Sequence, residues 1–483
     1  MSELNDVFNF LSGYVWDALV YILVIVGLTV TITSRFVQFR YFGRMFGVLR
    51  QAFHHEAGHI SSFQALMLSV AGRVGGGNIG GVAVAITLGG PGAVFWMWMI
   101  GLMGMATSFF ECSLAQLYKV WEPDGTYRGG PAFYVEKGLG KQWKPLSAVF
   151  SILLLLTFAF AFTGFQSVTV STSMEDAFGM SKYVTATLLA IALALILFGG
   201  IQRIASVTEF IVPIMAVGYL LIAFVVIVMN IGSVPAVFAR IVTEAFAPSA
   251  AISGGIGAAI MMGVKRGLFS NEAGLGSAPN VAAVAYVKHP CSQGTVQAFS
   301  VFIDTIVICS CTAFIILLSG IYQPGAENVQ GVVLTQNSLA DHVGQWGEAY
   351  VSVALMLFAF SSMLYNYYLG ENGIGYFDDT HQLPFNILKV LTLAWVFYAG
   401  TQSFGDILVF SDLSMGLLAI VNLVALVFLL KPMLRLLKDY DTQIAAGVEH
   451  PVFDPEKFSD LDIDKRAWTF DEEVPAAQAQ PAE

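Results

Sequence analysis

Long apolar blocks recur along the whole chain, and they constrain its fold more than any other feature. A membrane-spanning helix needs ~20 mostly apolar residues, and eleven segments of this sequence meet the requirement. Their approximate limits are 15–34, 62–88, 91–118, 146–172, 183–201, 207–231, 251–268, 296–320, 349–369, 385–400 and 406–430. Because the blocks are continuous rather than alternating, they predict helices and not barrel strands. We therefore expect an all-α polytopic membrane protein embedded in the lipid bilayer.

The charge content supports this class. Only 57 of 483 residues are charged (23 basic plus 34 acidic), or 12%, against about 25% in soluble domains. The net charge of −11 is concentrated in residues 439–483, where 12 acids and 3 bases give −9. We expect this acidic tail to be mostly disordered and cytoplasmic. Nothing in the composition indicates nucleic-acid binding.

The placement of basic residues predicts the orientation. Arg35, Arg40, Arg44 and Arg50 follow the first segment with no acid among them, and cytoplasmic loops carry the excess of Lys and Arg. The N-terminus is therefore expected outside, and eleven crossings place the C-terminus in the cytoplasm. The stretch 234–247 is too short to span, and we interpret it as an external interfacial helix.

A glycine triplet lies near the middle of segment 62–88. Gly75, Gly76 and Gly77 precede Asn78, and each glycine costs about 1 kcal/mol against alanine inside a helix. A helix broken at membrane depth must face a protein cavity. Its freed N–H groups can bind a carboxylate, and its freed carbonyls can coordinate a cation. The alternative is close helix packing through a small-xxx-small face.

Polar residues in other segments are further candidates. Asp304, followed by Thr305, lies near the middle of 296–320, where a carboxylate costs ~2.5–3.5 kcal/mol. It should face a binding site or an interhelical partner. Gln166, beside Phe165, could bind a substrate amine or carboxylate, or bond another helix.

Two adjacent hydroxyls occur in segment 349–369. Ser361 and Ser362 stand in a run of apolar residues and could offer oxygens to Na⁺. Serines in membrane helices also bond their own backbone, so both interpretations stay open.

A competing motif suggests a different class of protein. His55-Glu56-Ala57-Gly58-His59 fits the HExxH pattern of zinc proteases. It lies in the Arg-rich loop rather than in a span, and no third zinc ligand is evident. An intramembrane zinc protease and a channel are the alternatives to a transporter.

Several stretches form a pattern: GGGNIGGVA at 75–83, GGPGAVFWMW at 89–98, GGP at 129–131, KRGLFSNEAG at 265–274 and Asp304-Thr305. Over about residues 10–435 this pattern resembles the alanine/glycine:cation symporters, also called sodium:alanine symporters. Arg73, directly before the glycines, and Gly101 depart from what the resemblance leads us to expect.

The resemblance implies a fold of the leucine-transporter type, with one N-terminal helix and two inverted five-helix repeats. The implied divisions are an N-terminal helix and linker at 1–61, repeats at 62–231 and 251–430, an external segment at 232–250 and the tail at 431–483. The first and sixth core helices would be broken. For the sixth, the break could fall at Gly254–Gly257 or at Gly263.

The resemblance also implies roles for the candidate residues. The backbone of Gly75, Gly76 and Gly77, with Gly257 at the second break, would meet the substrate. Phe165, Gln166 and Asp304 would line its pocket. Asn78, with Asp304 or Thr305, would bind the nearer Na⁺. A second Na⁺ site would combine the carbonyls of Ala71, Val74 and Phe358 with the hydroxyls of Ser361 and Ser362.

These assignments imply a function without covalent chemistry. The chain would be a secondary transporter, and not an enzyme, that carries alanine or glycine into the cell with Na⁺ by alternating access. It would work as a monomer in a bacterial inner membrane and need no cofactor beyond Na⁺, the coupling ion.

Overall fold

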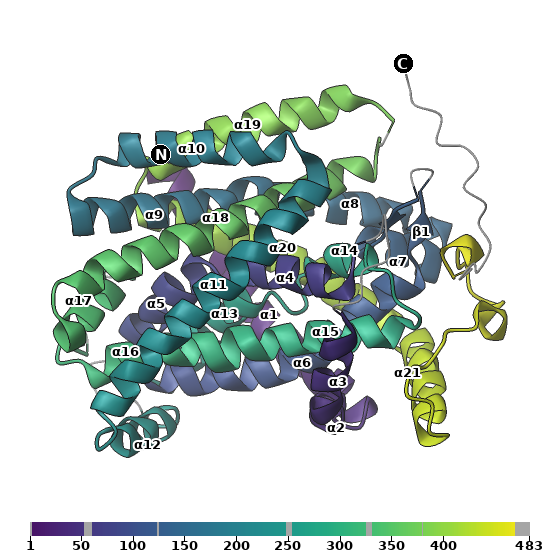
Figure 1. Cartoon of the computed structure of the whole chain (residues 1–483), viewed down its shortest axis with the longest axis horizontal. Helices are drawn as coiled ribbons and strands as arrows, with labels where there is room; N and C mark the ends of the chain where they lie inside the picture. The colour runs from purple at the N-terminus through teal and green to yellow at the C-terminus, as the bar shows by residue number, and fades with distance from the viewer. Residues whose placement is uncertain are drawn as a thin grey trace.

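Helices dominate the computed structural model of this chain (Figure 1). The structure describes residues 2–52, 60–122, 125–247, 254–324, 331–378 and 380–468. In this part of the chain the strands are a two-residue antiparallel pair, β1 (Val120–Trp121) and β2 (Tyr127–Arg128). The predicted all-α class is therefore confirmed.

The helices of the first half follow the predicted segments closely. In order they are α1 (Ser2–Thr33), α2 (Val37–Arg40), α3 (Phe42–Ala52), α4 (Ser62–Arg73), η1 (Gly77–Gly81), α5 (Val82–Gly89), α6 (Gly92–Leu117), α7 (Pro131–Leu139), η2 (Lys141–Trp143), α8 (Lys144–Leu155), η3 (Leu156–Phe162), α9 (Thr163–Phe178), α10 (Lys182–Leu197), α11 (Gly200–Met229) and α12 (Val234–Glu244). The last of these is the short helix expected at 234–247.

The second half continues in the same way. It contains α13 (Gly255–Asn271), α14 (Ala278–Ala283), α15 (Pro290–Val301), η4 (Phe302–Ile308), α16 (Cys309–Leu318), α17 (Val332–Val343), α18 (Trp346–Gly375), α19 (Gln382–Gly400), α20 (Phe404–Phe428), α21 (Leu430–Ala445), η5 (Pro455–Phe458) and η6 (Lys465–Trp468).

Eight helices in the described ranges are long and apolar enough to cross a membrane. They are Val7–Thr33, Gly92–Leu117, Lys141–Phe178, Gln202–Met229, Pro290–Leu318, Trp346–Gly375, Gln382–Gly400 and Phe404–Phe428. The shorter apolar helices Gly77–Gly89 and Lys182–Leu197 match two further predicted segments. The chain is thus a multi-pass membrane protein, while the count of eleven and the inverted repeat stay predictions.

Glycines allow α6 to approach its neighbours α12 and α15 closely. It packs against both α13 and α15. A Cβ added at Gly92 would lie 2.3 Å from the Glu244 backbone, and one at Gly294 would lie 2.1 Å from Ser113 Oγ. Only glycine permits these close approaches. In lipid the hydrophobic effect does not drive helices together, so the tight packing that they allow holds the helices in contact.

The two ends of the bundle carry different loops (Figure 1). The short helices α12 and α17 lie at one end, where the sequence predicts the external side. At the opposite end lie α3, α7, the β1–β2 pair and α21, which the sequence assigns to the cytoplasm. Which end faces the cytoplasm stays a prediction from the basic residues.

The expectation of a mostly disordered tail is wrong for residues 431–468. Helix α21 continues the chain beyond α20, and the following segment packs Phe453, Phe458 and Trp468 into the protein, each at most 3% exposed. Acidic composition suggested disorder, but these aromatic side chains bury enough apolar surface to order the segment. Residues 469–483 lie outside the described part.

Candidate functional site

The predicted interruption of segment 62–88 is present. Helix α4 ends at Arg73, Val74 has an extended backbone, and the chain resumes as the π-helix η1. The Gly75 N–H donates to Asn78 Oδ1 at 2.9 Å, and the Asn78 N–H donates to the Gly75 carbonyl at 3.1 Å. In an unbroken helix these two amides would instead bond the carbonyls of Ala71 and Val74. The break therefore frees both of those carbonyls.

A serine from α18 meets the two freed carbonyls. Ser362 Oγ lies 2.8 Å from the Ala71 oxygen, 3.2 Å from the Val74 oxygen and 3.0 Å from the Phe358 oxygen. One hydroxyl can donate only one hydrogen, so these oxygens are more acceptors than Ser362 can satisfy. The set has the character of a site for a hard cation. Ser361 Oγ bonds the Phe358 oxygen at 2.9 Å and reaches Met215 Sδ at 3.7 Å.

A second polar cluster surrounds Asp304 in η4. Its carboxylate accepts from Asn78 Nδ2 at 2.5 Å, from Ser270 Oγ at 2.5 Å and from Thr305 Oγ1 at 2.8 Å. All four residues are fully buried. Asn78 also approaches Cys309 Sγ at 3.3 Å. The structure thus brings Asn78, Asp304 and Thr305 together, as the family resemblance implied, and adds Ser270 from α13.

Gln166 of α9 completes the first break. Its Oε1 accepts the Gly76 N–H at 2.8 Å, while Phe165 packs beside the same glycine. A Cβ at Gly75 would lie 2.6 Å from both Gln166 Nε2 and Ser362 Oγ. Glycine is therefore required here by close approach as well as by the broken helix.

Three π-helical stretches of the described chain, η1, η3 and η4, lie in or beside this site. A π-turn frees backbone carbonyls and is often found at functional positions. In η3 these carbonyls find distant partners, since Trp395 Nε1 donates to Phe160 at 2.6 Å and Ser411 Oγ donates to Ala161 at 3.0 Å. The sequence alone did not indicate these π-turns.

The second break lies elsewhere than predicted. Helix α13 runs without interruption from Gly255 through Gly263 to Asn271, and the glycines at 254 and 255 have φ values of 89° and 57° at its start. They begin the helix and do not break it. The interruption falls at 272–277, before α14. Gly257 is exposed in the first turn of α13, so its expected place at the break is wrong.

Buried polar side chains support the second break. Glu111 accepts the Gly274 N–H at 3.2 Å, and Asn422 Nδ2 donates to the Gly274 carbonyl at 2.9 Å. Glu272, left-handed at φ 56°, accepts from Ser277 Oγ at 2.6 Å. Neither Glu111 nor Asn422 stood out in the sequence as a support of this break, because these contacts join α6 and α20 to the chain after α13.

Arg73 is buried and points to other helices than α18. Its guanidinium donates to the Gln297 carbonyl at 3.3 Å and to the hydroxyls of Ser300 and Ser108. Its charge attracts the carboxylates of nearby acids, which are Glu111, Glu272 and Asp304. Arg73 therefore balances buried negative charge. Within the described residues its hydrogen bonds go to Gln297, Ser300 and Ser108 and not to the oxygens around Ser362.

An aromatic cluster covers the site on the side of α13. The Phe269 ring lies 4.7 Å from Phe162 and 4.8 Å from Phe165, and it crowds Gly77. Beyond it, Arg266 binds Asp412 of α20 at 2.5 Å. Since the site residues themselves are buried, the structure is closed around them.

The HExxH motif at 55–59 lies outside the described residues. Within the described ranges, His, Cys, Asp and Glu side chains form no group of three or more that could hold a metal.

Comparisons with known proteins identify the family of this chain. The model of the sodium:alanine symporter family matches residues 1–455. This chain belongs to that family. It is accordingly a membrane transporter and not an enzyme, and the protease hypothesis is wrong.

Relatives match over nearly their whole length. The amino-acid carrier protein AlsT of Bacillus subtilis is 44% identical, covering 98% of this chain and 99% of the relative. The probable sodium/glutamine symporter GlnT of the same organism is 44% identical over 93% of each. The sodium/alanine symporter AgcS of Methanococcus maripaludis is 37% identical, covering 87% and 94%.

Proposed function

We propose that this transporter carries alanine, glycine or both into the cell with Na⁺, by alternating access. The observation that carries the proposal is the meeting of freed backbone groups with buried polar side chains at the first break. Na⁺ is transported with the amino acid and drives its accumulation.

The backbone at Gly75–Gly77 would bind the substrate carboxylate. Gln166 Oε1 now accepts the Gly76 N–H at 2.8 Å, which is the position a carboxylate oxygen would take. Amides at the start of a helix segment attract anions through the helix dipole. A small substrate would displace Gln166, whose amide could then bind it, while Phe165 limits the room for its side chain.

Two oxygen clusters would hold Na⁺. Asp304, Thr305 and Ser270, with Asn78 linking them to the break, form the cluster nearer the substrate. The second comprises the Ala71, Val74 and Phe358 carbonyls with Ser362, and Ser361 lies at its edge. Both clusters offer the oxygen ligands that hard cations prefer.

Alternating access requires the two covers of the site to open in turn. The outer cover would be the Phe269 cluster with the Arg266–Asp412 pair. The inner cover would be formed by α4 and α14, the half-helices on the side of α21. Transport would run inward across a bacterial inner membrane, with the N-terminus outside and one chain as the transport unit.

Uptake into proteoliposomes tests the function. Under an inward Na⁺ gradient we expect labelled alanine or glycine to accumulate above the external concentration, and to leak out when the gradient is dissipated. Equal concentrations on both sides at steady state would indicate a channel instead. Absence of any Na⁺ effect would contradict the proposal.

A competition panel tests the substrate. One methylene group changes binding by only ~1–3 kcal/mol, so alanine and glycine should compete with each other. The relative GlnT, as similar to this chain as AlsT at 44% identity, is called a probable sodium/glutamine symporter. Glutamine therefore belongs in the panel. Stronger competition by glutamine than by alanine would contradict the proposal that small substrates are preferred.

A further inference from the structure

The ordered segment after α20, residues 430–468, contacts the bundle at three separate places. On the linker that follows α1, Asp441 binds Arg40 at 2.8 Å and the Glu449 carbonyl accepts from Arg44 at 2.7 Å. On the chain after α14, the Phe453 N–H donates to the Lys288 carbonyl at 2.8 Å. On the chain after α6, Asp464 Oδ2 accepts the Trp121 N–H at 3.1 Å. The segment thus joins three parts of one end of the bundle.

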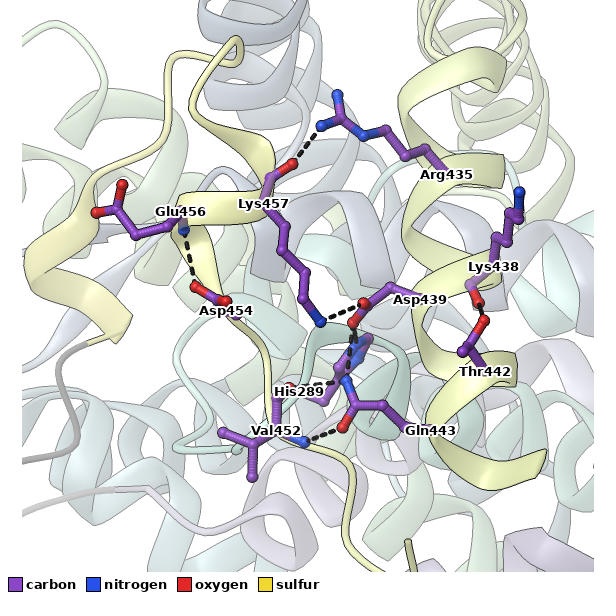
Figure 2. A network of polar contacts seen from close by, with 10 residues as sticks. All are labelled: His289, Arg435, Lys438, Asp439, Thr442, Gln443, Val452, Asp454, Glu456 and Lys457. Carbon is purple, nitrogen blue, oxygen red and sulfur yellow. Dashed lines mark hydrogen bonds and ion pairs between the residues drawn. The ribbon is translucent and has the colours of Figure 1, made fainter. Parts of the chain in front are cut away.

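Asp439 is the centre of the polar network in Figure 2. It accepts from Lys457 Nζ at 2.9 Å, from Gln443 Nε2 at 2.8 Å and from His289 Nε2 at 3.4 Å. His289 Nδ1 meanwhile accepts the Cys291 N–H at 3.1 Å and caps α15. This bonding makes His289 a neutral ring that donates to Asp439. Asp439 also binds Lys457, so it ties α21 both to the bundle and to the later part of the segment.

The last described turn covers a buried lysine. Lys119 is 1% exposed, and its Nζ lies 3.9 Å from the Tyr127 ring centre and 4.4 Å from that of Trp468. The amine also lies 3.4 Å from the Ala285 carbonyl. Burial lowers the pKa of Lys119 to about 7. Trp468 is therefore one of the groups that surround this buried amine.

The chain around Ala285, next to Lys119, joins α4 and α14, the half-helices on the side of α21. The Tyr286 N–H, just after α14, donates at 3.0 Å to the carbonyl of Ile60, just before α4. Gln116 Nε2 of α6 donates to the Ala285 carbonyl at 2.9 Å. If these half-helices are to separate, the chain at 285–289 must move, and the segment 430–468 is bound to it at Lys288 and His289.

We propose that residues 430–468 form a releasable latch that holds α4 and α14 together and must detach from Lys288 and His289 before the site opens to the cytoplasm. The proposal rests on the transport function and orientation given above. The contacts suit a latch because several are polar and exposed to solvent, where an ion pair contributes at most about 1 kcal/mol. They can break and form again in each cycle.

Reversible cross-linking tests the latch directly. Lys288 and Val452 are exposed, and Val452 directly precedes the residue bonded to Lys288. Lys288→Cys with Val452→Cys, joined by a short reducible bis-thiosulfonate, should lose Na⁺-driven alanine uptake about tenfold, because gating motions limit turnover. Reductant should restore it.

A matched pair controls for the reagent. Arg435 binds Asp460 at 2.6 Å, and both side chains belong to the segment itself. Arg435→Cys with Asp460→Cys, joined by the same reagent, ties the segment to itself only and should transport as before. A segment with a merely static role would tolerate both cross-links. Unchanged uptake after cross-linking at 288 and 452 would overturn the proposal.

Chemical labelling provides the second test. In the full-length chain Trp468→Ala should expose Lys119, so that its acetylation by a water-soluble ester, followed by mass spectrometry, proceeds at least about fivefold faster. Uptake should be as fast or faster, and Asp460→Asn should change neither. Unchanged Lys119 labelling or slower uptake would contradict the latch. If the unmodified protein shows no Na⁺-dependent uptake, the transport function fails instead.

Discussion

The two broken helices differ in what supports their interruptions. At the first, Gly75 and Gly76 donate to the neutral amides of Asn78 and Gln166, at 2.9 and 2.8 Å. At the second, Gly274 lies between the Glu111 carboxylate and the Asn422 amide. The first interruption is a short kink that continues as a π-turn, whereas the second spans 272–277.

This difference indicates separate tasks. Neutral side-chain amides can be exchanged for a substrate carboxylate at little electrostatic cost. A buried carboxylate that accepts a backbone hydrogen bond is costly to disturb, because removing its partner leaves an unpaired buried charge. We infer that the first break is the ligand-binding one, while the second is a stiff joint between α13 and α14. The following predictions test this contrast.

Asn78→Ala should have the largest effect. It removes the contacts of Asn78 to Gly75 and Asp304, and a hydrogen bond to a charged group contributes about 1.5–3 kcal/mol. We expect the Na⁺ affinity measured by alanine binding to fall roughly 100-fold. Asn230→Ala, at the end of α11, is the control. Unchanged Na⁺ dependence would remove Asn78 from the ion site.

Ser362→Ala should weaken Na⁺ activation of uptake by about tenfold, through the loss of one oxygen ligand and its hydrogen bond. The neighbouring Ser361→Ala is the matched comparison, because Ser361 Oγ contacts Phe358 and Met215 but neither freed carbonyl of α4. Its effect should be smaller. Equal effects on the Na⁺ concentration for half-maximal uptake would contradict this assignment.

Gly274→Ala should affect stability rather than ion binding. Its φ of 95° disfavours any side chain, and the added Cβ would lie 3.0 Å from Leu423 Cδ2. A left-handed residue with a Cβ costs about 1–2 kcal/mol, so thermal unfolding in detergent should begin at a lower temperature. Na⁺ affinity should stay unchanged; a parallel loss would mean that the second break also belongs to the ion site.

Acidification should have the smallest effect, a weaker attachment of the latch at His289, the residue just before α15. His289 faces Asp439 and Tyr440 of α21 and Lys457, and burial lowers its pKa from 6.5 despite the Asp439 contact. The latched state therefore keeps its full stability above pH 6.5 and loses it as the pH falls below 6.5, because the released histidine takes up a proton more readily.

The labelling of Lys119 measures this pH effect. After correction for the intrinsic reactivity of a free amine, Lys119 should be more accessible at pH 5.5 than at pH 7.5, and His289→Gln should abolish the difference. The pKa of Asp439 lies below its usual value, so this carboxylate does not titrate in the same interval. Greater protection at the lower pH would contradict the prediction.

Much of the fold was predictable because bilayer thickness translates directly into segment length. The apolar blocks predicted the helices, and the glycine triplet before Asn78 predicted a real interruption. Asp304, Gln166 and Ser362 stood out as polar residues in apolar surroundings, and the structure brings each of them to the first break. Their roles as ligands stay predictions.

Other features were decided by tertiary contacts alone. Glycines suggested a break at 254–257 or 263, but Gly254 and Gly255 use their positive φ values to start α13. The helix ends instead at Glu272, a non-glycine residue with positive φ, which local sequence could not identify. Ser277 and the nearby Arg73 stabilise Glu272 there. The acidic tail resembled a disordered chain because its partners, such as His289, Arg40 and Lys119, lie far away in the sequence.

The sequence by itself determined the class of this protein, its membrane helices and the first break, since hydrophobic length and helix propensity act locally. The tertiary structure alone decided which oxygens converge, where α13 ends and how the tail is held. Hydrogen bonds and ion pairs between distant segments control those features, and no local pattern encodes them.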